Sequence, residues 1–82
     1  MADFGLHGKT ALITGGTAGI GKAVAAEFAA AGAAVAIVGR RAGGQAVAAE
    51  IGATFIKADI TDRDEVGRMF AEAEEQIGAL DI

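Results

Sequence analysis

This sequence lacks cysteine, an excess of positive charge and long hydrophobic runs, and each absence excludes a class of protein. Because there is no cysteine, the chain has neither a disulfide framework nor a thiolate metal site, which suits a reducing cytoplasm. A net charge of -4 excludes the basic surface expected of a protein that binds nucleic acid or an anionic membrane. Uncharged runs such as residues 28–39 fall short of the roughly 20 apolar residues that a membrane-spanning helix needs.

The first residues give no sign of a targeting signal. Asp3 is acidic and no basic stretch leads into an apolar block, so we expect neither a secretion signal nor a transit peptide. His7, the only histidine, has no partner at the spacing of a catalytic or metal site, and we expect it on the surface. We therefore predict a cytoplasmic protein without a metal site, which binds neither nucleic acid nor membrane.

The sequence does contain an alternation of apolar runs and helical patterns, in a chain whose 82 residues form at most one small domain. A hydrophobic content of 52% with 22% charged residues is typical of a globular fold. Short apolar runs, typical of strands buried on both faces of a parallel sheet, lie at residues 9–14 and 34–38. Residues 53–58 are the third predicted strand, and residues 80–82 are the opening of a fourth. Helical patterns lie between them at residues 19–31, 43–51 and 62–77.

Each predicted helix has an apolar stripe and a recognisable end. The stripes that we expect to be buried are Ile20, Val24, Phe28 and Ala31 in the first helix, Val47 and Ile51 in the second, and Val66, Met69, Phe70, Ala73 and Ile77 in the third. Gly32, Gly52 and Gly78 stand where these helices are expected to end. Thr61 is the predicted N-cap of the third helix, on which Arg68 and Glu72 have the spacing of an exposed ion pair.

This alternation of strands and helices predicts the fold class α/β with a parallel sheet. Right-handed crossovers place the first two helices on one face of the sheet. The third helix must return past the first strand to cover the other face, which gives the strand order 3-2-1-4 with a truncated fourth strand. The sequence thus predicts part of a Rossmann-type doubly wound sheet, in which the loop after the first strand lies where such sheets bind ligands.

That loop, residues 14–21, is rich in glycine and joins the first strand to the first helix. Glycines allow sharp turns and a close approach of a ligand to the backbone, and the N-terminus of the following helix attracts an anion. The pattern Gly15-x-x-x-Gly19-x-Gly21 departs from the commonest dinucleotide spacing, G-x-G-x-x-G, but it has the preceding strand and following helix that such a site requires. It predicts a binding site for the phosphates of a dinucleotide.

The residues after the second strand favour one dinucleotide over another. Gly39, Arg40 and Arg41 stand about 20 residues after the loop, where NAD-binding sites place an acidic residue for the ribose. Two cations and no carboxylate favour a 2′-phosphate. We therefore predict NADP as the cofactor, with NAD as the alternative.

A competing motif overlaps the loop. Gly16-x-x-x-x-Gly21-Lys22-Ala23 matches a P-loop except at its last position, where Ser or Thr holds the magnesium ion that bridges nucleotide phosphates. Ala23 has no hydroxyl, and Lys22 is more simply a solvated lysine on the helix surface. A P-loop phosphotransfer fragment is therefore the weakest of the alternatives.

The motif Thr-Gly-x-x-x-Gly-Ile-Gly at residues 14–21 resembles that of the short-chain dehydrogenase/reductase family, and the similarity extends from about Gly8 to the last residue. Asp59-Ile60 is similar to the family's acidic-aliphatic pair that holds adenine, and Leu80-Asp81 to the start of its fourth strand. The cofactor-binding residues that the resemblance implies are Gly15, Thr17, Ala18, Gly19, Ile20, Gly21, Arg40, Arg41, Asp59 and Ile60.

The resemblance also implies how these residues share the cofactor. The glycine loop would line the pyrophosphate and the adenosine ribose. Asp59 would accept a hydrogen bond from the adenine amino group, and Ile60 would supply a backbone contact. Arg40, together with Arg41, would contact the 2′-phosphate. Many NADP-preferring relatives carry a basic residue where this chain has Ala18, so Arg40 must carry most of the preference.

By this resemblance the protein is an oxidoreductase that transfers hydride between the nicotinamide and a small-molecule carbonyl or alcohol, and its full-length form is a homo-oligomer. The family's catalytic Ser, Tyr, Lys and Asn would follow Ile82, and this chain contains no Tyr, Ser or Asn. We therefore expect residues 1–82 to be the N-terminal, cofactor-binding part of one Rossmann domain, without catalytic residues of its own. A stand-alone nucleotide-binding module without chemistry is the alternative.

Overall fold

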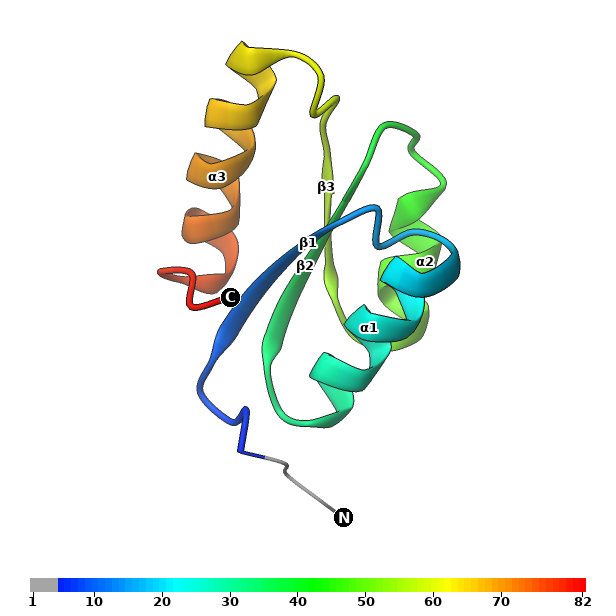
Figure 1. Ribbon diagram of the computed structural model, residues 1–82, viewed down its shortest axis with the longest axis vertical. Coiled ribbons are helices and arrows are strands. Elements are labelled where there is room, and N and C mark those ends of the chain that lie inside the picture. Colours follow the sequence, from blue (N-terminus) through cyan, green and yellow to red (C-terminus); the bar gives the residue numbers. More distant parts are fainter. Residues whose placement is uncertain (1–4) are drawn as a thin grey trace.

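The computed structural model describes residues 5–82, so Asp3 lies outside the described residues. Its elements follow in the order β1 (Thr10–Thr14), α1 (Gly19–Ala30), β2 (Ala34–Gly39), α2 (Gly44–Ile51), β3 (Thr54–Lys57) and α3 (Arg63–Ile77), as Figure 1 shows. The strands form one parallel sheet in the order β1-β2-β3, with Leu12 beside Ala36 and Val38 beside Ile56. The predicted α/β class, the parallel sheet and the strand order 3-2-1 are confirmed.

Residues 78–82 lie along the outer edge of β1, where a fourth strand is predicted, but they are not assigned as a strand. The Leu12 N–H donates to the Ile82 carbonyl at 3.0 Å, whereas the N–H groups of Asp81 and Ile82 both donate to the Thr10 carbonyl at 3.0 Å. The Thr10 N–H donates to the Asp81 carboxylate at 3.0 Å. Because two donors share one carbonyl and a side chain replaces a backbone acceptor, no regular ladder forms. The segment still occupies the place beside β1 that the order 3-2-1-4 requires.

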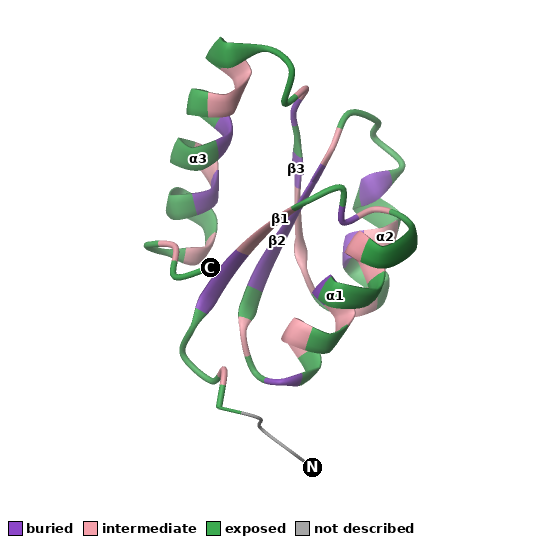
Figure 2. Ribbon diagram, viewed as in Figure 1, coloured by how far each residue is buried: buried purple, intermediate pink, exposed green. Residues whose placement is uncertain are grey.

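The helices cover the two faces of the sheet as the crossover rule predicts. α1 and α2 lie on one face and α3 lies on the other (Figure 1). Alternate residues of β2 belong to the cores on opposite faces of the sheet. Val35 and Ile37 belong to the core under α1 and α2, whereas Ala36 and Val38 pack with Met69 of α3. Figure 2 shows the buried residues on the strands and on the helix faces turned toward them. The sheet is therefore packed by helices on both of its faces.

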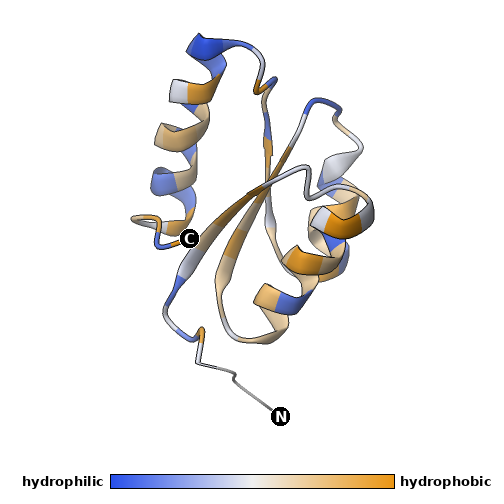
Figure 3. Cartoon of the chain, in the orientation of Figure 1, coloured by the Kyte–Doolittle hydropathy of each residue, from blue (hydrophilic) through white to orange (hydrophobic). Residues whose placement is uncertain are grey.

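The buried face of α1 differs from the predicted stripe. Ile20 is 85% exposed and Val24 is 38% exposed, whereas Ala25 is fully buried. Phe28 and Ala29 pack partly against the same core. Alanines make several faces of α1 similarly apolar, and Figure 3 shows hydrophobic and pale colours along much of this helix. The pattern alone could not single out one face, and the sheet selects a face whose small side chains allow close packing.

In α3 the predicted stripe is correct except at Phe70. Met69 and Ala73 are buried, and Val66 and Ile77 pack partly against them, but Phe70 is 47% exposed. The other members, at i, i+3, i+7 and i+11, already form a continuous face, so Phe70 lies at its margin. In Figure 3 α3 alternates between hydrophilic and hydrophobic bands, which is the clearer pattern that made this helix easier to predict.

The predicted helix ends at Gly52 and Gly78 are confirmed, because both glycines follow the last helical residue and have positive φ. α1 ends one residue earlier than predicted, with Ala31 as its C-cap, and Gly32 follows with φ of 102°. Within residues 5–82, none of the helices combines the length and the apolar character needed to cross a membrane.

α3 begins with Asp62 as its N-cap, which corrects the prediction of Thr61. Asp62 Oδ1 accepts hydrogen bonds from the N–H groups of Asp64 at 2.9 Å and Glu65 at 3.3 Å. Thr61 Oγ1 instead donates to Asp59 Oδ1 at 2.6 Å. Thr and Asp are both favoured at N-caps, so the sequence could not choose between the two neighbours.

We expect Asp62→Ala to lower the free energy of unfolding by about 1 kcal/mol, because two N–H groups at the start of α3 lose their acceptor. Urea denaturation followed by circular dichroism measures the change. Asp64→Ala is the matched control, since it removes a carboxylate of the same turn that caps no N–H group, and we expect it to cost less than about 0.5 kcal/mol. Equal effects of the two substitutions would contradict the assignment of the cap.

Candidate functional site

The glycine-rich loop turns back onto the first turn of α1. Gly15 and Gly19 have φ of 69° and 59°, in the left-handed region that favours glycine. Gly21 is required for a different reason, because a Cβ there would lie 2.7 Å from the carbonyl carbon of Gly15. The Gly15 N–H donates to the Val38 carbonyl at 3.2 Å, which anchors the loop to the end of β2. The result is a tight turn at the carboxyl edge of the sheet.

The N-terminus of α1 opens into this loop without a side-chain cap. Its N-cap residue, Ala18, has an extended backbone, and the first turn carries no acidic residue. The Lys22 N–H donates to the Ala18 carbonyl at 3.2 Å, so the preceding N–H groups of Gly19, Ile20 and Gly21 lie ahead of the helical ladder. An anion such as a phosphate is the partner that the helix dipole favours at this end.

Two clefts share a wall beside the loop. The large cleft, of about 430 Å³, is lined by Gly15, Thr17, Val38, Gly39, Arg40, Ala58, Asp59, Ile60 and Thr61. The small cleft, of about 390 Å³, is lined by Thr17, Arg40, Arg41, Gly43, Gly44 and Val47. Thr17 and Arg40 line both, so a ligand that passes from one cleft to the other passes these two side chains.

The structure brings half of the predicted site residues together in one cleft. Those in the large cleft are Gly15, Thr17, Arg40, Asp59 and Ile60. Arg41 lines only the small cleft, and residues 18–21 line neither, because they form the start of α1. Sequence reasoning missed Gly39 and Thr61. A Cβ on Gly39 would lie 2.9 Å from Thr17 Cγ2, so a glycine closing a predicted strand opposite the loop was a usable signal.

Arg40 and Arg41 are both exposed at the end of β2. Within residues 5–82 neither forms an ion pair. Arg40 lies close enough to Asp59 to contribute to the lowered pKa of that carboxyl group. Two guanidinium groups that line the clefts and pair with no carboxylate of the described residues are suited to bind a phosphate.

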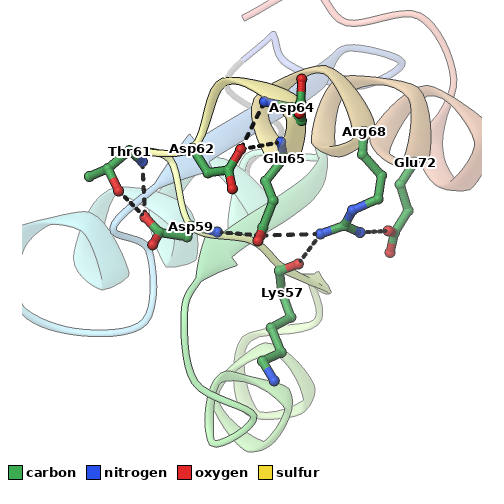
Figure 4. Close-up of polar contacts among 8 residues, drawn as sticks. All are labelled: Lys57, Asp59, Thr61, Asp62, Asp64, Glu65, Arg68 and Glu72. Atoms are coloured by element: carbon green, nitrogen blue, oxygen red, sulfur yellow. Dashed lines mark hydrogen bonds and ion pairs between the residues drawn. The ribbon is translucent and has the colours of Figure 1, made fainter.

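The turn after β3 holds the carboxylate of Asp59 in one orientation (Figure 4). Its Oδ1 accepts hydrogen bonds from the Thr61 N–H at 2.9 Å and from Thr61 Oγ1 at 2.6 Å. The side-chain bond and then the backbone bond lower the pKa of Asp59, slight desolvation opposes them, and Arg40 adds a smaller lowering. Asp59 is therefore ionised at neutral pH, and its Oδ2 accepts no hydrogen bond from residues 5–82.

We expect Thr61→Val to raise the pKa of Asp59 toward its ordinary value of 3.8, because the hydroxyl donor is lost while the backbone N–H remains. The stabilisation that Asp59 gives the folded state is present above pH 3.8 and is lost as the pH falls through the lowered pKa. In the variant, Asp59 gives less stabilisation, and it is lost at a higher pH. An NMR titration of the Asp59 carboxyl carbon measures the shift, and an unchanged midpoint would contradict it.

Side chains of α3 contact the same turn (Figure 4). Glu65 Oε1 accepts a hydrogen bond from the Asp59 N–H at 2.8 Å. Arg68 Nη2 donates to the Lys57 carbonyl at 3.0 Å and lies 3.5 Å from Glu65 Oε1. Arg68 Nη1 pairs with Glu72 Oε1 at 3.1 Å, which confirms the predicted ion pair. These contacts tie the first two turns of α3 to the end of β3.

Lys22 differs from the solvated lysine that the sequence predicts, because its Nζ pairs with Glu50 Oε1 of α2 at 3.2 Å. A P-loop lysine has to reach the nucleotide phosphates. Here the lysine is held by the neighbouring helix, and Ala23 offers no hydroxyl for magnesium. The geometry gives no support to the P-loop alternative.

Comparison with known proteins places these features in a family. Residues 9–82 match the family model for short chain dehydrogenases. The 3beta-hydroxysteroid dehydrogenase of Mediterraneibacter gnavus is 45% identical over 80 residues, which cover 90% of this chain and 29% of the relative. The sorbitol dehydrogenase of Cereibacter sphaeroides is 45% identical over 80 residues, which cover 94% of this chain and 31% of the relative.

A solved structure has the same fold. The crystal structure of 3-ketoacyl-(acyl-carrier-protein) reductase from Brucella melitensis, complexed with NADH, matches with a TM-score of 0.88 at 42% identity, over 93% of this chain and 32% of that one. The chain thus spans about a third of the length of the relatives it matches. Since the family match runs from Lys9 to Ile82 and includes every strand and helix of this Rossmann-type sheet, the chain belongs to the short-chain dehydrogenase/reductase family.

Proposed function

We propose that this chain is the cofactor-binding part of an NADP(H)-preferring oxidoreductase. The observation that carries the proposal is the large cleft, which gathers Gly15, Arg40 and Asp59 from three separate loops at the carboxyl ends of β1, β2 and β3. Doubly wound sheets bind their ligands at this edge. One extended ligand with phosphates, a ribose and a base fits such a row of sites better than a compact one.

The residues of the site suit the parts of a dinucleotide in order. The turn at Gly15 and the open N-terminus of α1 suit the pyrophosphate, because backbone N–H groups and the helix dipole favour an anion there. The Asp59 carboxylate offers Oδ2 as an acceptor for the adenine amino group. Ile60, which is 51% exposed beside it, offers apolar surface for the base.

The preference for NADP(H) depends on Arg40. Its guanidinium lines the wall between the two clefts, and no acidic residue stands next to it at the end of β2. A cation at this position favours a 2′-phosphate over a free 2′-hydroxyl. Arg41, which lines only the small cleft, would assist.

A bound nicotinamide dinucleotide supplies the hydride chemistry. Two of the relatives are named dehydrogenases and one a reductase, so we propose a small-molecule alcohol or carbonyl as the substrate of the complete protein. We also propose that the complete protein is cytoplasmic and homo-oligomeric. The chain contains no Tyr, Ser or Asn, so residues 1–82 alone are expected to bind the cofactor without catalysing hydride transfer.

A calorimetric titration of the chain with NADPH, NADH and Mg-ATP tests the proposal, with circular dichroism of the same sample as the check of folding. We expect NADPH to bind most tightly and without magnesium. A folded sample that prefers Mg-ATP would revive the P-loop alternative, and one that binds no dinucleotide would contradict the proposed function.

A further inference from the structure

We propose that Glu65, supported by Arg68, is a positioning residue for adenine recognition, a role that rests on the dinucleotide-binding function proposed above. Neither side chain lines the large cleft. Glu65 acts instead through the backbone of Asp59, whose N–H it accepts at 2.8 Å. Figure 4 shows the three side chains on adjoining segments, with Asp59 on the turn and the other two on α3.

The contact that Glu65 makes differs from the one its position predicts. Glu65 is the third residue of α3, where a glutamate usually returns to the N–H of the N-cap residue in a capping box. Here the N–H of the N-cap residue, Asp62, donates to the Asp59 carbonyl at 3.0 Å. The Glu65 carboxylate reaches past Asp62 to the Asp59 N–H. Glu65 therefore fixes the turn that carries Asp59 rather than the end of the helix.

As a consequence, Asp59 is held at three of its four polar groups. Glu65 accepts from its N–H, Asp62 donates to its carbonyl, and Thr61 donates twice to its Oδ1. The remaining group, Oδ2, accepts no hydrogen bond from residues 5–82, and it belongs to a residue that lines the large cleft. A single acceptor in a fixed orientation is suited to select a ligand by one donor, such as the exocyclic amino group of adenine.

Arg68 links the Glu65 carboxylate to the backbone at the end of β3. Glu65 and Arg68 are 39% and 52% exposed, so their ion pair alone would stabilise the turn only slightly. Further contacts fix the position of the guanidinium group: its Nη2 also donates to the Lys57 carbonyl at 3.0 Å, and its Nη1 pairs with Glu72. The chain on both sides of Ala58 is thereby attached to α3, through Lys57 on one side and Asp59 on the other.

The test measures how well the chain distinguishes NADPH from the analogue in which hypoxanthine, with an oxo group in place of the amino group, replaces adenine. By calorimetric titration, we expect the wild type to bind NADPH about tenfold more tightly, as one charge-assisted hydrogen bond allows. Glu65→Ala is expected to reduce this preference to about twofold or less, because the turn that carries Asp59 loses the acceptor that ties its backbone to α3. Glu65→Gln keeps an acceptor oxygen and should retain the preference.

Glu72→Gln is the matched control, since it removes the other carboxylate that pairs with Arg68 without touching the turn, and we expect it to retain the preference. A general loss of stability would lower the affinity for NADPH and for the analogue by the same factor, and so would leave the preference unchanged. A tenfold preference that survives in Glu65→Ala therefore overturns the proposal. If Glu65→Ala loses its helical circular dichroism signal, Arg68→Met decides instead: a reduced preference supports the proposal and a retained one overturns it.

The wild-type result separates this proposal from the function on which it rests. A folded wild-type chain that binds neither dinucleotide contradicts the proposed function. A wild-type chain that binds both dinucleotides equally retains the proposed function but overturns the role of Glu65, because there is then no adenine recognition for it to support.

Discussion

Gly21→Ala is expected to abolish dinucleotide binding and to lower the free energy of unfolding by about 2–3 kcal/mol. The added Cβ would lie 2.7 Å from the Gly15 carbonyl carbon and 3.2 Å from the Gly16 nitrogen. These are backbone atoms, so they cannot move aside as a flexible side chain could. The loop would have to shift away from α1, and the turn at the predicted pyrophosphate site would be lost with it.

Gly67→Ala is the matched control for this substitution, because it also adds a methyl group to a helical glycine. A Cβ at Gly67 of α3 would have no atom within 4 Å apart from its chain neighbours and the backbone of its own helix. We expect this variant to bind the dinucleotide normally and to be more stable by about 0.5–1 kcal/mol, since alanine is the better helix former. Urea denaturation and NADPH titration measure both effects. Wild-type NADPH affinity in Gly21→Ala would refute the assignment of the loop.

The second large effect is expected for Arg40→Ala, which should weaken NADPH binding by about 10- to 100-fold, the worth of a charge-assisted hydrogen bond to a phosphate. NADH binding should change by less than about threefold, because a 2′-hydroxyl gains little from the guanidinium. Removing Arg40 also removes a charge that lowers the pKa of Asp59, but Asp59 stays ionised at neutral pH through its bonds to Thr61.

Arg63→Ala controls for the loss of one positive charge, since Arg63 is an exposed residue of α3 that lines neither cleft. It should leave the ratio of NADPH to NADH affinity unchanged. Arg41→Ala should have an intermediate effect, because Arg41 lines only the small cleft. If Arg40→Ala weakens NADPH and NADH equally, Arg40 does not read the 2′-phosphate, and the predicted preference for NADP is wrong.

The sheet could be predicted from the sequence because its signals are local and redundant. Apolar runs such as residues 34–38 are too short for helices and are closed by glycine, and the handedness of crossovers leaves few orders for the strands. The fourth strand was the exception. Its pairing with β1 depends on which of two N–H groups reaches the Thr10 carbonyl, and both do, which no apolar pattern encodes.

Helix faces were predictable only where polar residues mark the opposite side. In α3 charged residues set off Met69 and Ala73, and the buried face was correct apart from Phe70. In α1 alanines occur on every side, so Ile20 and Val24 were expected to be buried although they are exposed. Small side chains leave the choice of face to tertiary packing.

The candidate site also has one part that could be predicted from the sequence and one part that could not. The glycine loop could be predicted from residue type, since glycine adopts the positive φ at Gly15 and Gly19 without the strain that a side chain brings. The contact from Glu65 to the Asp59 N–H could not be predicted, because the same spacing also fits a capping box that returns to Asp62. Which contact forms depends on how the turn after β3 packs on α3.

The most direct test of the central claim is a map of backbone amide shifts in a ¹⁵N-labelled sample of the chain as NADPH is added. The account predicts the largest shifts at residues 15–21, at Arg40 and at residues 58–61, which surround the large cleft and the open end of α1. The amide signals of residues on the outer face of α3, such as Glu75, should not shift. Shifts confined to that face, or none in a folded sample, would contradict the claim that this cleft holds the dinucleotide.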